Sequence, residues 1–157
     1  MSPSSSHSDI TTASAAETEA FARGLAARLP DGCVVTLNGD LGAGKTVFAR
    51  GLARGLGITE PVTSPTFTIV QEYPRPGGGW FYHLDLYRIR GADDALAFGL
   101  EEFLFQPHTL TVIEWPERLG DLLETELPAG ARHVPVQITA LDDTRRTIRL
   151  PADLAGM

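Results

Sequence analysis

Two amphipathic helices are predicted from apolar residues repeated at helical spacing. The first begins at Ser14, which opens the capping box Ser14-Ala15-Ala16-Glu17, and it carries Phe21, Leu25 and Leu29 four residues apart. The second follows Lys45, with Phe48, Leu52 and Leu56 at the same spacing before Gly57, a natural helix terminator. We expect both helices to turn these apolar stripes toward a common core.

Strands are predicted where β-branched and aromatic residues form short runs. The runs cover residues 34–37, 67–73, 80–87, 110–115, 133–139 and 146–150. The turn at residues 74–79 joins the second and third runs into an antiparallel hairpin, and Asp142-Asp143 joins the last two. Short helices are expected over residues 91–105, in two pieces divided near Gly99, and over residues 117–124.

The domain organisation follows from where this patterning starts. Residues 1–13 are rich in Ser and Thr without apolar periodicity, so we expect a disordered tail there. Residues 14–157 are expected to form a single domain, because no internal repeat or linker divides them.

Composition narrows the class of protein. Hydrophobic residues make up 43% and charged residues 21% of the 157, as in a soluble globular protein. A net charge of −7 argues against a surface that grips a nucleic-acid backbone on its own. Cys33 has no second cysteine to pair with, which favours a reducing cytoplasm, and we interpret it as a small buried hydrophobe. We expect no membrane association, because no apolar run is long enough to span a bilayer and residues 1–6 lack the core of a secretory leader.

A phosphate-binding loop is predicted between the strand at residues 34–37 and the second helix. The frame Gly39-x-x-x-x-Gly44-Lys45-Thr46 fits this motif. Its glycines expose backbone N–H groups, and the helix that follows directs its positive end at the same anion. We therefore expect a nucleotide phosphate to bind here, on Gly39, Asp40, Leu41, Gly42, Ala43, Gly44, Lys45 and Thr46. Lys45 would reach the β- and γ-phosphates, and the Thr46 hydroxyl would bind Mg²⁺.

Two acidic residues are candidates for the magnesium site. Asp85 and Glu114 each stand late in an apolar strand, where a carboxylate is costly without a cation or donor nearby. Either could instead cap a helix or pair with an arginine such as Arg88. Together with a phosphate loop they favour a pair facing Mg²⁺, and which of them would activate water stays open.

Three further positions have two interpretations each. Thr66, in the hydroxyl-rich segment between Pro61 and residue 67, could reach the γ-phosphate or could serve only turn chemistry. Trp115 could stack on a base or lie in the core. His83 alternates with Asp85 on one strand face, and a partly buried structural histidine is favoured there over a general base.

Four ordered motifs resemble the TsaE family of bacterial ATPases. They are Gly39-Asp40-Leu41-Gly42-Ala43-Gly44-Lys45-Thr46, Ser64-Pro65-Thr66-Phe67, His83-Leu84-Asp85-Leu86-Tyr87-Arg88 and Ile113-Glu114-Trp115-Pro116. The similarity covers roughly residues 14 to 128. It implies an α/β protein with the three-layer P-loop NTPase fold, in which helices flank a mixed, mainly parallel sheet. It also implies a role in forming threonylcarbamoyladenosine at position 37 of tRNAs that read codons beginning with A.

The resemblance also implies an activity and its partners. ATP hydrolysis would be weak alone and would be coupled to the TsaB–TsaD complex, in which TsaD transfers the threonylcarbamoyl group. Contact with tRNA would come only through that complex.

The same resemblance implies roles for individual residues. Lys45 would bind phosphate, and Thr46 with Glu114 would hold Mg²⁺. Asp85 would serve the nucleotide or its attacking water, and Thr66 would lie in a switch-like loop. Trp115 would pack at the nucleotide site, and Thr18 would approach the nucleotide.

Two other functions are compatible with a phosphate loop. A small P-loop kinase for a metabolite or nucleotide would need an acceptor pocket and an arginine-bearing lid, and the sequence has no separate lid insertion. A nucleotide-gated binding module would bind ATP without needing its hydrolysis.

Overall fold

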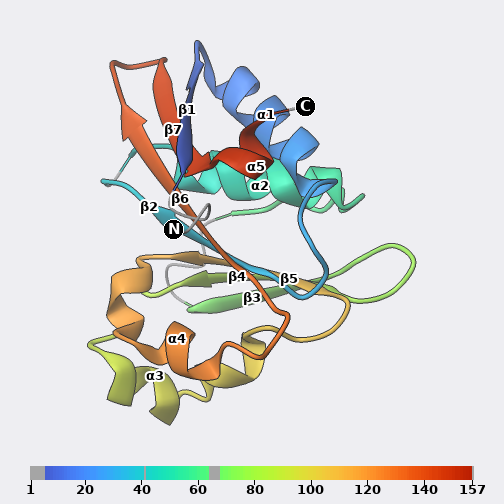
Figure 1. Ribbon diagram of the computed structural model, residues 1–157, viewed down its shortest axis with the longest axis vertical. Helices are drawn as coiled ribbons and strands as arrows, with labels where there is room; N and C mark the ends of the chain where they lie inside the picture. The colour runs from blue at the N-terminus through green and yellow to red at the C-terminus, as the bar shows by residue number, and fades with distance from the viewer. Residues whose placement is uncertain (1–5, 41, 64–67, 157) are drawn as a thin grey trace.

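A seven-stranded sheet with helices on both faces organises the chain (Figure 1). The computed structural model describes residues 6–40, 42–63 and 68–156. The strands are β1 (His7–Thr12), β2 (Val34–Asn38), β3 (Val70–Pro74), β4 (Trp80–Asp85), β5 (Thr109–Glu114), β6 (His133–Ala140) and β7 (Arg146–Pro151). The α-helices are α1 (Ala15–Ala26), α2 (Lys45–Gly55), α3 (Ala92–Ala97), α4 (Leu122–Glu126) and α5 (Ala152–Ala155). The described residues also form the 3₁₀ turns η2 (Leu100–Phe103) and η3 (Pro116–Leu119).

The strand order β1-β7-β6-β2-β5-β4-β3 divides the sheet into a parallel centre and antiparallel margins. β6, β2, β5 and β4 are parallel neighbours, whereas β1–β7, β7–β6 and β4–β3 are antiparallel pairs. The predicted mixed α/β sheet is therefore confirmed, with its parallel pairs confined to the centre. Because the four central strands point the same way, their carboxyl ends meet at one edge of the sheet.

The N-terminal segment differs from the prediction. His7–Thr12 forms β1, which pairs with β7 along its whole length, from His7 opposite Pro151 to Thr12 opposite Arg146. Asp9 and Arg149 add an ion pair across these strands at 2.9 Å. The predicted disordered tail is thus wrong for residues 7–12, where backbone pairing with a distant strand supplies the order that the side-chain pattern lacks. Residues 1–5 of that prediction lie outside the described residues.

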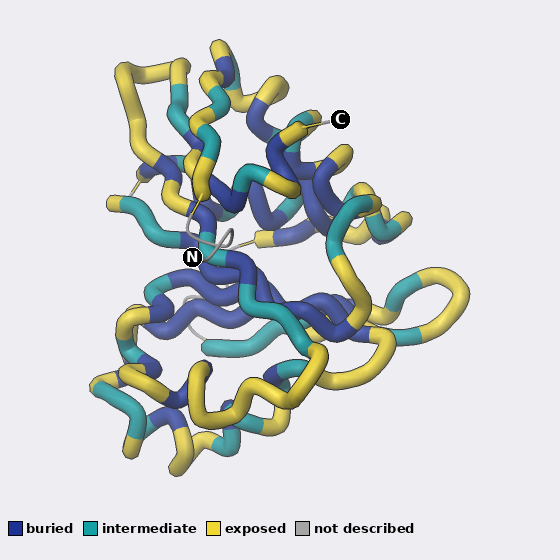
Figure 2. Tube along the Cα trace, viewed as in Figure 1, coloured by how far each residue is buried: buried dark blue, intermediate teal, exposed yellow. Residues whose placement is uncertain are grey.

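Two apolar cores fill the space between the sheet and its helices. One lies on the face covered by α1, α2 and α5, and includes Leu25, Val35 and Phe48. The other lies on the face of α3 and α4, and includes Leu84, Ile113 and Leu122. Figure 2 shows burial concentrated in the central strands and exposure along the outer turns. This arrangement is the expected three-layer one.

The helices α1 and α2 pack unusually closely because small residues face each other. A Cβ added at Gly51 would lie 2.4 Å from the Glu19 carbonyl oxygen and 2.7 Å from the Ala22 Cβ. One added at Gly55 would lie 2.6 Å from the Ala26 Cβ. We call this contact, made by Gly51 and Gly55 with Ala22 and Ala26, the helix seam. It fixes α2, and with it the residues at its start, against the body of the protein.

The predicted helix cap, hairpin and helix break, which depend on residues close together in the sequence, were confirmed. Ser14 caps α1 by accepting a hydrogen bond from the Glu17 N–H at 3.1 Å, and the Glu17 carboxylate accepts one from the Ala13 N–H at 2.8 Å. The hairpin is β3–β4, and α3 and η2 divide at Gly99 as expected. The helix expected over residues 117–124 is instead two short pieces, η3 and α4. Across the described ranges, no helix combines the length and the apolar character needed to cross a bilayer.

Candidate functional site

The predicted phosphate loop lies at the carboxyl edge of the central strands, between the end of β2 and the start of α2. Gly44 stands immediately before α2 with φ of 104°, a left-handed conformation that side chains rarely tolerate. Gly39 has a different reason to be glycine, because a Cβ there would lie 2.5 Å from the Ile138 carbonyl oxygen of β6. The loop is thus packed against β6, and α2 begins directly after it, with its N-terminus at the edge of the sheet.

A hollow of about 500 Å³ opens beside this loop. Besides the loop glycines Gly42 and Gly44, its walls bring together five side chains that the sequence singled out, namely Lys45, Thr46, Asp85, Glu114 and Trp115. They come from α2, from the ends of β4 and β5, and from the turn after β5. Val47, Tyr87 and Arg146 complete the lining.

The two carboxylates lie side by side because their strands are parallel neighbours in register, with Asp85 opposite Glu114. Both residues are buried, at 6% and 4% exposure. The Thr46 hydroxyl donates to Oε2 of Glu114 across 3.4 Å. Asp85 Oδ1 accepts a hydrogen bond from the Tyr87 N–H at 3.0 Å. Acidic groups are therefore present at the start of the helix that follows the phosphate loop.

These oxygen donors fit a magnesium ion that arrives with a nucleotide. Mg²⁺ prefers one or two carboxylates together with phosphate oxygens and waters, rather than an all-protein cage. The hydroxyl of Thr46 and the carboxylates of Glu114 and Asp85 supply such a set. In the part of the chain that the structure describes, no three His, Cys, Asp or Glu residues gather as a metal-binding cluster.

Lys45 and Trp115 contact each other at the mouth of the loop. The Lys45 ammonium donates to the Gly39 carbonyl oxygen at 2.9 Å and lies 3.9 Å from the centre of the Trp115 ring. Trp115 adopts a left-handed backbone conformation with φ of 59°, which is costly for a large side chain. Its ring also packs against Tyr87, with 5.1 Å between ring centroids. Trp115 thus lies over the phosphate-loop lysine and is only partly buried.

Arg146 is a site residue that the sequence did not reveal. It is 103 residues from Ala43 in the chain, yet its Nε donates to the Ala43 carbonyl oxygen at 2.7 Å. Its Nη2 donates to the Gly42 carbonyl oxygen at 3.4 Å. In the sequence it is only the first residue of a predicted strand, and no spacing rule connects it to the phosphate loop.

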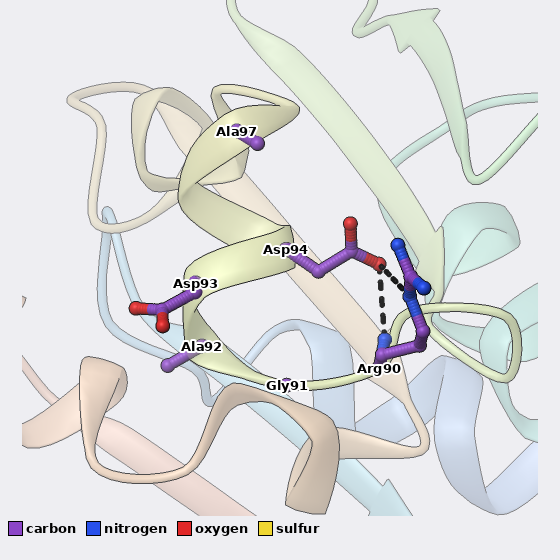
Figure 3. A pocket seen from close by; sticks show the side chains of 6 residues that line it. All are labelled: Arg90, Gly91, Ala92, Asp93, Asp94 and Ala97. Atoms are coloured by element: carbon purple, nitrogen blue, oxygen red, sulfur yellow. Dashed lines mark hydrogen bonds and ion pairs between the residues drawn. The ribbon is translucent and has the colours of Figure 1, made fainter.

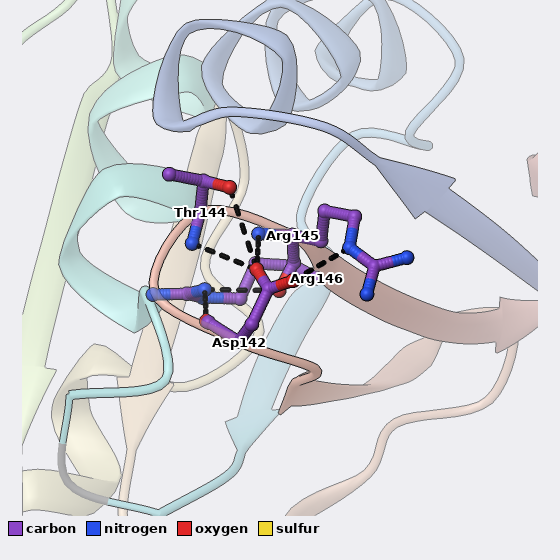
Figure 4. A network of polar contacts seen from close by, with 4 residues as sticks. All are labelled: Asp142, Thr144, Arg145 and Arg146. Atoms are coloured by element: carbon purple, nitrogen blue, oxygen red, sulfur yellow. Dashed lines mark hydrogen bonds and ion pairs between the residues drawn. The ribbon is translucent and has the colours of Figure 1, made fainter.

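The turn before Arg146 is tied by Asp142 (Figure 4). The Asp142 carboxylate accepts hydrogen bonds from the backbone N–H groups of Thr144 and Arg145 and from the Arg145 guanidinium. These donors, the backbone and side-chain groups of Arg145 first among them, hold the pKa of Asp142 well below its ordinary value. Arg146 Nη1 in turn donates to the Asp142 carbonyl oxygen at 2.8 Å. The β6–β7 turn therefore presents Arg146 to the loop from a fixed position.

Thr18 lies beside the phosphate loop, on α1. It lines a small hollow of about 50 Å³ together with Gly44, Val47 and Arg146. Its hydroxyl is buried and hydrogen-bonded to the Thr12 hydroxyl at 2.6 Å. Thr18 is thus adjacent to the site, because Gly44, Val47 and Arg146 line both hollows.

Some predicted residues are not brought into the hollow. Asp40 and Ala43 line a separate depression of about 130 Å³ with Gln137 and Ile138 of β6. Leu41 and Thr66 lie outside the described residues, as does Ser64. A further hollow of about 540 Å³ lies at α3 (Figure 3), where Arg90 and Asp94 pair with each other at 3.9 Å.

Comparison with known proteins agrees with this geometry. The family model "Threonylcarbamoyl adenosine biosynthesis protein TsaE" matches residues 12–148. The chain is 47% identical over 107 residues to the tRNA threonylcarbamoyladenosine biosynthesis protein TsaE of Synechocystis, which covers 67% of this chain and 68% of that protein. It is 43% identical over 129 residues to the Bacillus subtilis protein of the same name, covering 82% of this chain and 76% of that one. The crystal structure of Bacillus subtilis YdiB is similar with a TM-score of 0.67 and 37% identity, over 92% of this chain and 84% of that one.

Proposed function

The chain belongs to the TsaE family of tRNA threonylcarbamoyladenosine biosynthesis proteins, and from that premise we propose that it is an ATPase supporting this modification. Family membership supports a role in the pathway. Hydrolysis of ATP, the use of Mg²⁺ and association with TsaB and TsaD are the finer parts of the proposal.

One observation carries the ATPase proposal. The Thr46 hydroxyl, at the start of α2, and the buried Glu114 carboxylate, at the end of β5, lie 3.4 Å apart beside the phosphate loop. A buried carboxylate next to a helix N-terminus and a lysine is expected where a cation and a polyphosphate meet. A glycine-rich turn that binds no ligand would not require a buried carboxylate beside it.

Each residue then has a role in the proposed site. The backbone N–H groups of residues 42–46 and the N-terminus of α2 would hold the β- and γ-phosphates. Lys45 would exchange its contact with the Gly39 carbonyl oxygen for phosphate oxygens. Thr46 and Glu114 would hold Mg²⁺, which when bound supplies positive charge against the phosphate oxygens. Asp85 would orient the nucleotide or accept the proton of the attacking water.

The remaining residues would complete the nucleotide site. Trp115 would pack beside the bound phosphates, over Lys45, and Thr18 would approach the nucleotide from α1. Thr66, in its switch-like loop, would act on the γ-phosphate side of the site.

Family membership suggests TsaB and TsaD as partners, and the exposure of the site supports docking there. Tyr87, which lines the hollow, is 51% exposed, so water reaches the place where hydrolysis would occur. Phosphoryl transfer is faster in a closed and ordered site, so docking of TsaB–TsaD over this edge would stimulate a weak basal activity. The net charge of −7 supports contact with tRNA through that complex rather than directly. A role in tRNA modification supports a cytoplasmic location.

The test is a Glu114→Ala variant assayed in the reconstituted TsaB–TsaD reaction. At saturating ATP we expect turnover and tRNA modification to fall by about 100-fold or more. The nucleotide should still bind, although more weakly in Mg²⁺ than it binds to the parent protein. Glu117→Ala, which removes an exposed carboxylate three residues further along, is the matched control and should be unaffected. Full modification by Glu114→Ala would instead favour a nucleotide-gated binding module.

A pull-down with TsaB and TsaD, in ATP and in ADP, tests the partner proposal separately. We expect retention that differs between the two nucleotides. If the protein retained neither TsaB nor TsaD, in ATP or in ADP, the partner proposal would be contradicted. A P-loop kinase would be recognised by acceleration of ATP turnover by a small acceptor without TsaB–TsaD.

A further inference from the structure

His83 is a fully buried histidine in the middle of β4, with 0% of its surface exposed. It shares a sheet face with Phe81 before it and with Val112 opposite it, both of which belong to the apolar core under α1 and α2. Its ring packs against the Phe81 ring, with 6.4 Å between centroids. The imidazole is therefore a polar group placed within an otherwise apolar layer.

The contact that His83 makes points to the carboxylate of the proposed site. His83 Nε2 lies 2.7 Å from Oε2 of Glu114, the same oxygen that the Thr46 hydroxyl approaches. A carboxylate only accepts hydrogen bonds, so Nε2 must carry the hydrogen and donate it. This bond runs between neighbouring strands and restrains the rotation of the Glu114 side chain.

The other ring nitrogen has no comparable role. Within the described part of the chain, Nδ1 is buried and has no hydrogen-bond partner. If His83 served packing alone, an apolar side chain could fill the same space and would leave no buried polar atom unpaired. Among the described residues, the hydrogen bond of this ring is the one to Glu114.

We propose that His83 is a positioning residue that holds the Glu114 carboxylate toward Thr46, and so sets how strongly the site takes a magnesium–nucleotide complex. The inference rests on the proposed function, because it concerns the same site. Residues that hold a metal-binding carboxylate in place typically contribute about 10- to 100-fold to metal affinity. His83 acts here through Glu114 and does not itself touch the nucleotide.

The first test is calorimetric binding of a non-hydrolysable ATP analogue to the full chain, with Mg²⁺ and with EDTA. His83→Leu should weaken binding by about 10- to 100-fold in Mg²⁺ and by less than about threefold in EDTA. His83→Gln should recover most of the loss, because its amide nitrogen can occupy the place of Nε2 while nothing needs to replace Nδ1.

His133→Leu is the matched control. It also removes a histidine hydrogen bond from the sheet, the 2.8 Å contact between His133 Nε2 and the Thr36 hydroxyl. Thr36 is paired with Ile113, so this contact lies on the face of the sheet opposite to the Glu114 side chain. Its Mg²⁺-dependent binding should equal that of the parent protein, which separates positioning from a general loss of stability.

A second measurement needs no metal and no substitution of His83. Long-range ¹H–¹⁵N spectra of the ¹⁵N-labelled protein should show a hydrogen on His83 Nε2, and Glu114→Gln should shift that signal. A hydrogen on Nδ1 alone would overturn the proposal even if His83→Leu failed to fold.

The outcomes separate this inference from the proposed function. A folded His83→Leu that binds the magnesium–nucleotide complex as tightly as the parent would refute the inference alone. A parent protein that binds the analogue equally well in Mg²⁺ and in EDTA would refute the magnesium site itself, and the positioning role with it.

Discussion

Gly51→Ala should destabilise the protein, although alanine is the better helix former. In an exposed helix this change gains about 1 kcal/mol. At the helix seam, the new methyl would lie 2.4 Å from the Glu19 carbonyl oxygen and 2.7 Å from the Ala22 Cβ. Both are parts of α1 that cannot rotate away, so α1 would have to recede by about 1 Å to restore ordinary contact.

The magnitude follows from comparing these two effects. Overpacking of a well-packed core costs about 1–3 kcal/mol. Because the added methyl would meet backbone that cannot move aside, we expect its steric cost to be about 3 kcal/mol. After the gain in helix propensity, the free energy of unfolding should fall by about 2 kcal/mol. For a chain of this size, Tm should fall by about 4–8 °C.

Differential scanning calorimetry measures the effect, with Gly24→Ala as the matched control. Gly24 lies in α1 but faces outward, and the nearest atom to an added Cβ is the Arg28 Nη1 at 3.9 Å. There alanine should stabilise by about 0.5–1 kcal/mol. A rise in Tm for Gly51→Ala comparable to that for Gly24→Ala would refute the seam as a steric constraint.

Three further predictions concern other parts of the chain. Burial raises the pKa of the Cys33 thiol to about 12, so iodoacetamide should label it only in denaturant; labelling of the native protein at the rate of a free thiol would contradict this. Burial lowers the pKa of His133 below its ordinary 6.5, so its contribution to stability is complete above that pH and is lost as the pH falls toward the lower folded value. Urea midpoints should therefore drop more between pH 7.5 and 5.5 in the parent than in His133→Gln, and equal drops would exclude this linkage. Arg146→Ala removes the hydrogen bonds to the Ala43 and Gly42 carbonyl oxygens. In a calorimetric titration it should weaken nucleotide binding by about tenfold, or about 1.4 kcal/mol. Unchanged affinity would show that the loop holds its shape without the guanidinium.

The candidate site was predictable from sequence where the signal is local. The glycine frame ending in Lys45-Thr46 and the carboxylates late in apolar strands carry their information within a few residues. Parallel strands then bring such residues to one edge, so Asp85 and Glu114 meet as neighbours in register.

The parts that escaped prediction depend on contacts between distant segments. β1 owes its order to backbone pairing with β7, for which Ile10 is the only apolar signal in His7–Thr12. Arg146 reaches the phosphate loop because β7 lies beside β6, which packs on Gly39. His83 was expected to be partly buried, yet it is fully enclosed, since α2 covers the face of β4 that carries it.

The pairing of β1 with β7 has a consequence for biosynthesis. Residues 7–12 emerge from the ribosome early, but the strand that they join is made only when residues 146–151 have been translated. Until then the nascent chain lacks both β7 and the Arg146 guanidinium, which donates a hydrogen bond to the Ala43 carbonyl oxygen in the glycine-rich loop. Competence to take up a nucleotide should therefore arise in one late step, after release of the last β-hairpin from the exit tunnel, and not by gradual growth during translation.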